Sequence, residues 1–178
     1  MATPEHPPLD RTEFEQVVAE YADRLYSIAL RITASPPDAE DAVQEAFVSA
    51  YHHLGDYRGE AKPATWLYRI TVNAALRRVR ARPPHEYLDI LTETSEPLDD
   101  WATRVRDPAL AAELRDQLER ALQELAPDLR AAVILRDVEC LSAREAAAAL
   151  DIGEAALKSR LHRARVLLRQ ALADYLSS

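Results

Sequence analysis

The residues best suited to chemistry in this sequence are basic side chains spaced for binding rather than for catalysis. Between residues 155 and 173 every charged side chain is basic: Lys158, Arg160, Arg163, Arg165 and Arg169. At about 100° per residue, a helix would pack through Leu157, Leu161, Ala164 and Leu168. The opposite side would present Lys158, Ser159, His162 and Arg163. This segment therefore predicts a helix that packs on one side and contacts DNA phosphates and base edges with the other.

A second basic segment spans residues 63–82, which contain arginines and no acidic residue. On a helix, one stripe about 80° wide would hold Arg69, Asn73, Arg77 and Arg80. Its guanidinium groups can bind phosphates, and its amide can pair with a base edge. The whole chain nevertheless carries a net charge of −8. The acidic remainder would suppress indiscriminate DNA binding, so the two basic segments indicate selective contacts.

A third surface is predicted between these segments and the N-terminus, on a helix covering about residues 36–54. Its outward face would carry Asp41, Gln44, Glu45, Val48 and His52. This mixture of acidic and apolar side chains is suited to a basic protein partner.

Catalytic and metal sites have little support in the sequence. There is no Gly-rich phosphate loop or nucleophile motif, and the adjacent His52 and His53 would point about 100° apart on a helix. Cys140 is the only cysteine, which excludes an intramolecular disulfide and a cysteine-cluster zinc site. We expect Cys140 to be a mostly buried, inert side chain. We therefore expect no enzyme activity, no cofactor, no metal and no small-molecule substrate.

The elements that position these faces are predicted to be helices throughout, because only 3 glycines occur and no segment alternates apolar with polar residues as a strand would. Capping boxes at Thr12–Glu15 and Ser142–Glu145 open helices over about 12–33 and 143–150, and Ser35 caps the helix that follows it. The remaining helices are predicted over about 65–82, from 108, over about 128–139 and from 154. The fold class is all-α.

These helices group into two small domains. We expect a disordered N-terminus (1–9), a helical bundle (10–82), a flexible acidic linker (83–107) and a second domain (108–178). In the second domain, a short helix, a tight turn and a helix with a basic outer face form a helix-turn-helix arrangement, whose second helix can lie in the major groove. No signal peptide or run of about 18 apolar residues is present, so we expect a cytosolic protein without membrane insertion.

The segment LSAREAAAALDIGEAALKSRLHRARVLLRQAL resembles region 4, the promoter-reading part of extracytoplasmic-function (ECF) sigma factors. DAEDAVQEAFVSAY resembles the polymerase-binding segment of region 2 in the same family, and YRGEAKPATWLYRITVNAALRRVRAR resembles its promoter-melting segment. The resemblance covers nearly the whole chain in the family's order. It implies a factor that binds core RNA polymerase, directs it to promoters through their −10 and −35 elements, and helps to open the DNA.

The resemblance also assigns partners to the predicted surfaces. It implies that the face containing Asp41 and Glu45 docks on the clamp helices of the largest polymerase subunit, and that region 4 meets the flap of the second-largest subunit. The arginine stripe becomes the −10 surface, where Tyr57 and Asn73 line a pocket for a base flipped from the single-stranded non-template strand. We expect Trp66 to pack in the core.

For duplex DNA at the −35 element, the implied major-groove residues are Lys158, Ser159, His162 and Arg163, and the implied phosphate contacts include Arg160 and Arg165. The linker would thread the polymerase cleft, where its negative charge would mimic RNA. An anti-sigma factor is a further implied partner. The sequence departs from the family's pattern at Arg77, Asp151, Ala155 and Ala156, which leaves the promoter sequence open.

Two other classes of protein remain compatible with the residues. A conventional helix-turn-helix regulator would use the first bundle for dimerisation or sensing and would bind DNA without polymerase. A helical adaptor would use its arginine faces to bind acidic protein partners.

Overall fold

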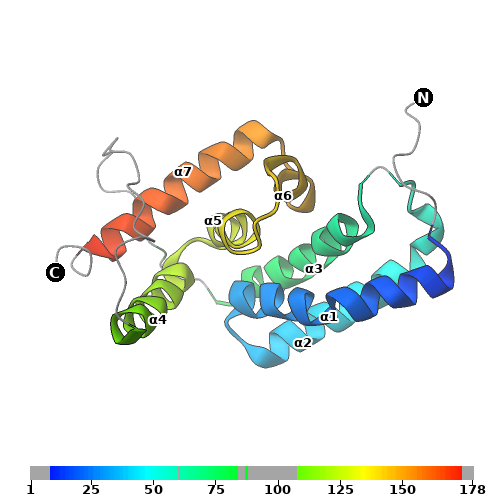
Figure 1. The fold of residues 1–178 in the computed structure, drawn as a ribbon, viewed down its shortest axis with the longest axis horizontal. Helices are drawn as coiled ribbons and strands as arrows, with labels where there is room; N and C mark the ends of the chain where they lie inside the picture. The colour runs from blue at the N-terminus through cyan, green and yellow to red at the C-terminus, as the bar shows by residue number, and fades with distance from the viewer. Residues whose placement is uncertain (1–8, 60, 84–86, 88–107, 174–178) are drawn as a thin grey trace.

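The described part of the chain is a set of helices joined by short turns (Figure 1). The computed structural model describes residues 9–59, 61–83, 87 and 108–173, and describes no side chain of residues 108–112. The helices are α1 (Arg11–Thr33), α2 (Pro36–His52), the 3-10 turn η1 (Leu54–Asp56), α3 (Pro63–Arg80), α4 (Pro108–Glu124), α5 (Pro127–Val133), the π-helical turn η3 (Ile134–Val138), α6 (Ala143–Ala149) and α7 (Glu154–Ala171). No strand occurs in these residues, and the all-α prediction is confirmed. The predicted disordered N-terminus and acidic linker lie almost entirely outside the described residues.

Side-chain caps fix where the helices begin. Ser142 Oγ accepts a hydrogen bond from the Glu145 N–H at 3.2 Å while Glu145 Oε2 accepts from the Ser142 N–H at 3.0 Å, which confirms the second capping box. Ser35 Oγ accepts from the Asp38 N–H at 3.4 Å, which confirms the cap of α2.

The first capping box was predicted two residues too late. Asp10, not Thr12, caps α1: Asp10 Oδ1 accepts from the Glu13 N–H at 2.8 Å, and Glu13 Oε2 accepts from the Asp10 N–H at 2.9 Å. Aspartate is at least as good an N-cap as threonine. The capping box formed by Asp10 and Glu13 therefore starts the helix at Arg11, ahead of the start predicted from Thr12.

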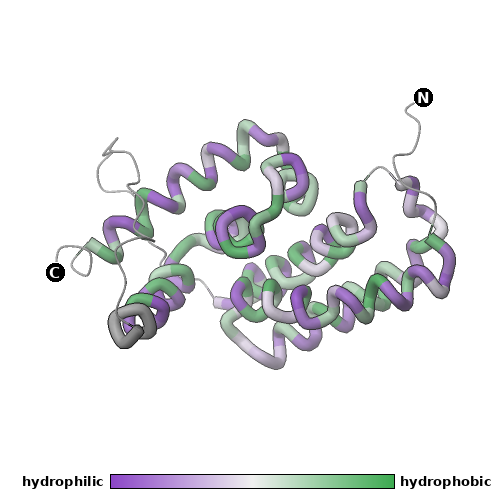
Figure 2. The backbone as a smooth tube through the Cα atoms, viewed as in Figure 1, coloured by the Kyte–Doolittle hydropathy of each residue, from purple (hydrophilic) through white to green (hydrophobic). Residues whose placement is uncertain are grey.

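The first three helices form one bundle. Leu25, Ile28 and Ile32 of α1 are fully buried, as are Leu67 and Val72 of α3, and the two helices pack against each other. The inward positions of α2 are occupied by alanines, whose small side chains bring the helices close together: Ala39, Ala42, Ala46 and Ala50. Apolar and polar residues alternate along the helices, as expected for helices with one buried side (Figure 2). The bundle leaves one long face of α3 exposed.

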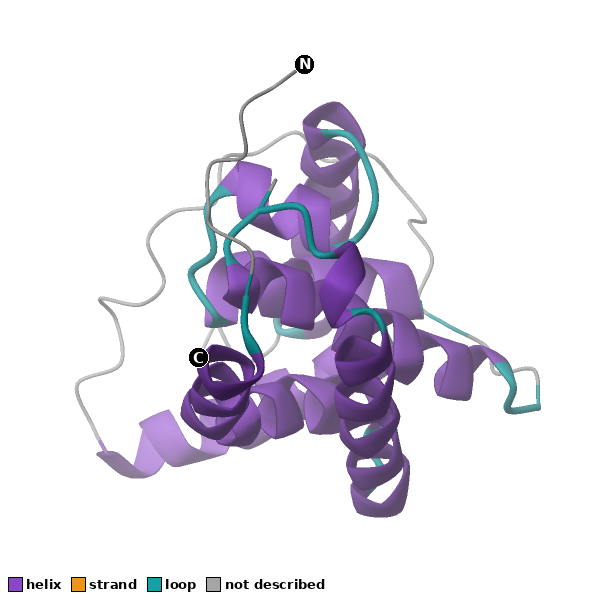
Figure 3. Ribbon diagram, turned by 90° about the vertical axis from the view of Figure 1, so that its right-hand side faces the viewer, coloured by secondary structure: helices purple, strands orange, loops and turns teal. Residues whose placement is uncertain are grey.

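The second domain packs directly against the first. Helices α5 and α6 contact α3, while η3 and α5 contact α1, so that the buried residues of both domains form one continuous apolar cluster. Figure 1 shows α5 and α6 between α7 and the first bundle, and Figure 3 shows only helices, loops and turns in the described part of the chain. The sequence predicted two domains but not that they dock on each other.

Arg130 of α5 is buried at this junction, with a relative exposure of 3%. Its Nη1 donates to the Ile32 carbonyl of α1 at 2.7 Å, and its Nη2 donates to the Leu125 carbonyl at 3.0 Å and to the Gln123 carbonyl. Burial lowers the pKa of Arg130 to about 10, which still leaves it charged at neutral pH. One guanidinium thus satisfies carbonyl groups from both domains.

Cys140 was predicted to be mostly buried, and this prediction is wrong. The residue is exposed and has a φ of 55° between η3 and α6. This left-handed residue lies in the connection between η3 and α6, where it is open to solvent and is not part of the core.

We predict that Arg130→Ala lowers the free energy of unfolding by about 2–4 kcal/mol, because it leaves buried carbonyl groups without donors. Urea denaturation followed by far-ultraviolet circular dichroism measures this loss. Arg115→Ala, at an exposed position of α4, is the control and should change stability by no more than about 0.5 kcal/mol. Equal stability of the two variants would contradict the role given to Arg130.

Candidate nucleic-acid and polymerase interfaces

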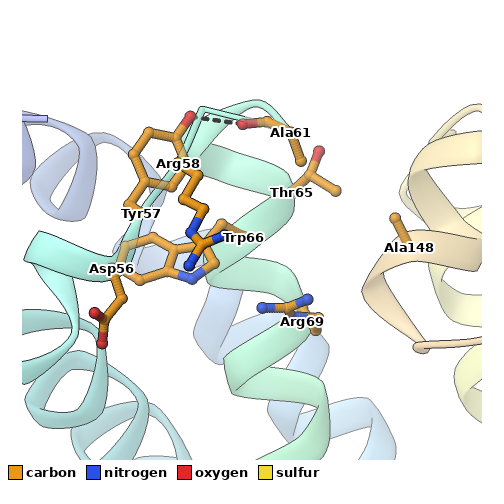
Figure 4. Close-up of a pocket in the computed structure, with 8 residues that line it drawn as sticks. All are labelled: Asp56, Tyr57, Arg58, Ala61, Thr65, Trp66, Arg69 and Ala148. Atoms are coloured by element: carbon orange, nitrogen blue, oxygen red, sulfur yellow. Dashed lines mark hydrogen bonds between the residues drawn. The ribbon is translucent and has the colours of Figure 1, made fainter. Parts of the chain in front are cut away.

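A pocket opens where η1 and the following loop meet the start of α3. It has a volume of about 270 Å³. Seven of its lining residues come from the first domain and one from α6: Asp56, Tyr57, Arg58, Ala61, Thr65, Trp66, Arg69 and Ala148. Figure 4 shows Ala148 facing the other side chains from across the opening. The pocket therefore spans the junction between the domains.

Tyr57 and Trp66 form the aromatic wall of this pocket. Their ring centroids are 5.3 Å apart and the rings are tilted by 45°. The Tyr57 hydroxyl donates to the Ala61 carbonyl at 2.6 Å, which closes the loop between η1 and α3, and burial raises its pKa. Trp66 is half-buried: it packs against the core, as predicted, and it also lines the pocket. The sequence analysis did not predict that Trp66, Arg58 and Arg69 line the pocket.

Asn73 does not line this pocket. It lies one helical turn beyond Arg69 on the exposed face of α3, in the stripe that continues to Arg77 and Arg80. All four stripe residues are exposed. The structure thus places Tyr57 in the pocket and Asn73 on the surface leading away from it.

Carboxylates of α2 bind the arginines at the end of α3. Glu45 accepts a hydrogen bond from Arg78 Nη1 at 2.7 Å and another from Arg77. Asp41 Oδ2 lies 3.8 Å from Arg78, and Asp38 is paired with Arg82. The Arg78 and Arg77 guanidinium groups hold the pKa of Glu45 below its usual range. Two residues of the predicted polymerase face are therefore already paired with α3.

The outward face of α2 nevertheless exposes apolar surface. Val48 is 53% exposed and Tyr51, one turn further on, is 45% exposed. Gln44 and His52 are exposed beside them. The Tyr51 ring contacts Phe14 and lies 5.5 Å from the Arg11 guanidinium. Tyr51 was not among the predicted residues, although its spacing from Val48 places it on the same face.

Helix α7 has the two faces that its sequence predicted. Leu157, Leu161, Ala164 and Leu168 are buried. Lys158, Ser159, His162 and Arg163 are exposed. No carboxylate among the described residues lies within ion-pair distance of Lys158 or Arg163. Arg165, in contrast, makes a bidentate ion pair with Asp137. Its Nη2 donates to Asp137 Oδ1 at 2.6 Å and its Nε donates to Oδ2 at 3.0 Å. Arg160 is half-buried.

An ion pair joins the pocket loop to the helix-turn-helix. Lys62 Nζ lies 2.9 Å from Glu145 Oε1, the same carboxylate that closes the capping box of α6. Lys62 and Ser142 together lower the pKa of Glu145 to about 2. Within the described residues, no group of three His, Cys, Asp or Glu side chains is arranged to hold a metal ion.

These surfaces define a class of protein. A helix-turn-helix with a basic outer face, docked on a bundle that carries a basic stripe and an aromatic pocket, is suited to bind duplex DNA and unpaired bases in one chain. Two family models match in the same order: Sigma-70 region 2 over residues 17–83 and Sigma-70 region 4 over residues 115–168.

Curated relatives agree with this class. The chain is 32% identical to the ECF RNA polymerase sigma factor SigW of Bacillus subtilis, in an alignment that covers 93% of this chain and 91% of that protein. It is 34% identical to the RNA polymerase sigma-H factor of Pseudomonas aeruginosa, covering 92% and 88%. It is 35% identical to the ECF RNA polymerase sigma-E factor of Escherichia coli, covering 88% and 84%. The chain belongs to the ECF sigma factors of the sigma-70 family, and it directs RNA polymerase to promoters.

Solved structures share the fold. A structure of CnrH in complex with the cytosolic domain of CnrY has a TM-score of 0.66 and 27% identity, with 93% of this chain and 90% of that chain covered. The sigma factor RpoE of Bartonella quintana, solved in complex with the anti-sigma factor NepR, has the same TM-score at 23% identity, with 91% and 98% covered. None of the helices in the described part of the chain combines the length and apolar character needed to cross a bilayer.

The lowered pKa of Glu145 predicts a pH-dependent contribution to stability. Because the folded-state pKa lies below the unfolded value, the stabilisation is fully present above about pH 4.5 and is lost as the pH falls toward 2. We expect wild type to be more stable than Glu145→Gln at pH 6 and this difference to shrink steadily toward pH 3, as measured by urea denaturation. A difference that stays constant over this range would contradict the prediction. Glu113→Gln, at an exposed site on α4, controls for loss of a carboxylate.

Proposed function

We propose that this sigma factor reads the two promoter elements with its two basic surfaces: duplex DNA at −35 with α7, and the single-stranded non-template strand at −10 with α3 and the pocket. The observation that carries the proposal is the pairing of an exposed basic face on α7 with an aromatic, arginine-lined pocket beside the exposed stripe of α3. The two surfaces belong to different domains, so each can contact its own promoter element.

In the pocket, Tyr57 and Trp66 would stack with a flipped base while Arg58 and Arg69 neutralise the adjoining phosphates. Asn73 lies one turn further along α3, where its amide can pair with the edge of a neighbouring base. DNA opened in this way is held by binding energy alone, so the proposal requires no enzyme activity, no cofactor and no small-molecule substrate.

Polymerase would dock on the exposed face of α2. Val48 and Tyr51 offer an apolar centre, and Asp41, Gln44, Glu45 and His52 offer a polar rim that fits the basic clamp helices of the largest subunit. The second domain would contact the flap of the second-largest subunit. A protein with these contacts would act in the bacterial cytosol, on the nucleoid when it is part of the holoenzyme.

An anti-sigma factor would be a further partner. The similar protein CnrH was solved with a second protein, CnrY, bound to it. The exposed apolar residues of α2 and the basic faces of α3 and α7 would be covered by such a partner, which would prevent polymerase and promoter binding.

Run-off transcription with bacterial core polymerase and a library of promoter fragments tests the proposed function. We expect transcripts only when the factor is added, and their start sites reveal the −10 and −35 sequences. Tight binding to duplex DNA without polymerase, together with no factor-dependent transcript, would favour a conventional regulator instead.

We predict that Lys158→Ala or Arg163→Ala weakens −35-dependent promoter binding by the holoenzyme. Each lost contact is worth about 1–3 kcal/mol, roughly a 5-fold to 150-fold loss in affinity. Electrophoretic mobility shift with holoenzyme measures the change. Arg120→Ala, an exposed arginine on α4, should leave affinity unaltered. Unchanged occupancy in both reading-helix variants would contradict the assignment of α7.

We predict that Asn73→Ala leaves polymerase binding unaltered and reduces open-complex formation about 10-fold, equivalent to one base contact. Permanganate footprinting of unpaired thymines measures opening, and co-elution with core polymerase measures docking. Gln16→Ala, which removes an exposed amide on α1, is the control. An equal loss of docking and opening would place Asn73 in the polymerase contact or in folding.

A further inference from the structure

We propose that the ion pair between Arg165 and Asp137 sets the rotation of α7 about its own axis, and through it the sequence preference at −35. Arg165 is then a positioning residue instead of the phosphate contact that the resemblance implied. This inference rests on the proposed function, because it takes α7 as the helix that reads the −35 element. It deepens that function by naming a pair of side chains that decides which bases are read without touching them.

Arg165 donates to both oxygens of one carboxylate. Its Nη2 lies 2.6 Å from Asp137 Oδ1, and its Nε lies 3.0 Å from Oδ2. Two parallel hydrogen bonds fix the relative orientation of the two groups as well as their distance. The Arg165 and Asp137 side chains are 39% and 32% exposed, so water screens this pair less than a fully exposed one. The pair therefore differs from the weak single contacts typical of a protein surface.

Asp137 is carried by a turn that is itself fixed in the core. It lies in the π-helical turn η3, where the Glu139 N–H donates to the Ile134 carbonyl at 2.8 Å. Ile134 and the following Leu135 are fully buried, and the Leu135 carbonyl accepts from the Leu141 N–H at 3.1 Å. π-helical turns are rare and frequently occur at functional sites. This turn gives Asp137 a fixed place from which to hold α7.

Arg165 lies in line with residues proposed to read bases. It follows Lys158 on α7 by two helical turns less about 20°, which is about 10 Å along the axis. His162 lies between them, about 60° from Arg165 around the helix. Lys158 and His162 are exposed. A rotation of α7 that the ion pair permitted would therefore move both of these side chains.

The apolar contacts of α7 hold its rotation less strictly. Its buried side packs through Leu157, Leu161 and Leu168, and the helix contacts α4, α5 and α6. Apolar burial is non-directional, so it opposes a small roll of the helix less than a directed hydrogen bond does. Base contacts, in contrast, require the reading residues to be held within about 10–20°. The bidentate pair, about 40° around the helix from Leu161, supplies this directional restraint.

Asp137→Asn separates positioning from phosphate contact, because the two roles predict different changes. Competition mobility shift with holoenzyme compares a promoter found by run-off transcription with a copy whose −35 element is scrambled. We expect the ratio of the two affinities to fall roughly 5-fold, the loss of about one base contact, with affinity for the scrambled copy unaltered. A phosphate contact released from its carboxylate would instead raise the affinity for both fragments.

Arg165→Lys keeps the positive charge but cannot form the bidentate pair. It should lower the ratio as Asp137→Asn does, and the double variant should show no further loss, because both changes break the same pair. Asp116→Asn, the same change at an exposed position of α4, is the control and should leave the ratio unaltered. Circular dichroism, together with unaltered affinity for the scrambled copy, establishes that each variant folds and binds polymerase.

The positioning role is refuted if the ratio for Asp137→Asn equals that for Asp116→Asn, or if the affinity for both fragments rises. Failure of the proposed function is a separate result. In that case run-off transcription yields no factor-dependent promoter, or wild-type holoenzyme binds the promoter and its scrambled copy equally.

Discussion

The buried guanidinium of Arg130 occupies the point where the two domains meet. A charge in that position is stable only if carbonyl groups surround it, and these groups come from Ile32 in the first domain and from Gln123 and Leu125 in the second. The requirement fixes α5 against the end of α1. Because α5 leads through η3 to the helix-turn-helix, it also places α6 against α3. The positions of the pocket wall and of the reading helix follow from this one contact.

Charge balance explains much of the remaining surface. A factor that binds DNA needs cations, yet this chain is acidic overall. The arginines at the end of α3 are balanced by Asp38, Asp41 and Glu45 of α2, and Arg80 is balanced by Asp128. On α7, Arg165 is paired with Asp137, whereas Lys158 and Arg163 have no partner among the described residues. The proposed DNA-reading face of α7 is thus exposed, whereas Arg77 and Arg80 at the far end of the α3 stripe are paired with carboxylates of the same chain.

Glu45 shows how one residue can belong to two surfaces. Its position on the outer side of α2 indicated a contact for polymerase, and the structure pairs it with Arg77 and Arg78 on the helix proposed to bind DNA. A partner that engaged Glu45 would change the electrostatic environment of both arginines. The proposed docking face and the proposed DNA-binding face are therefore joined by side chains in direct contact.

The sequence alone determined the helices, the caps at Ser35 and Ser142, the two faces of α7 and the family. These features depend on residues within a few positions of one another, where helical periodicity and capping geometry dominate. Tertiary structure decided that Trp66 lines the pocket as well as packing on the core, and that Asn73 does not line it. It also decided the exposure of Cys140 and the docking of α6 on α3. Each depends on residues far apart in the chain, such as Lys62 with Glu145, whose approach is set by how the helices pack. Local periodicity shows which face of a helix is polar, but only packing decides whether water, DNA or a carboxylate of the same chain lies against it.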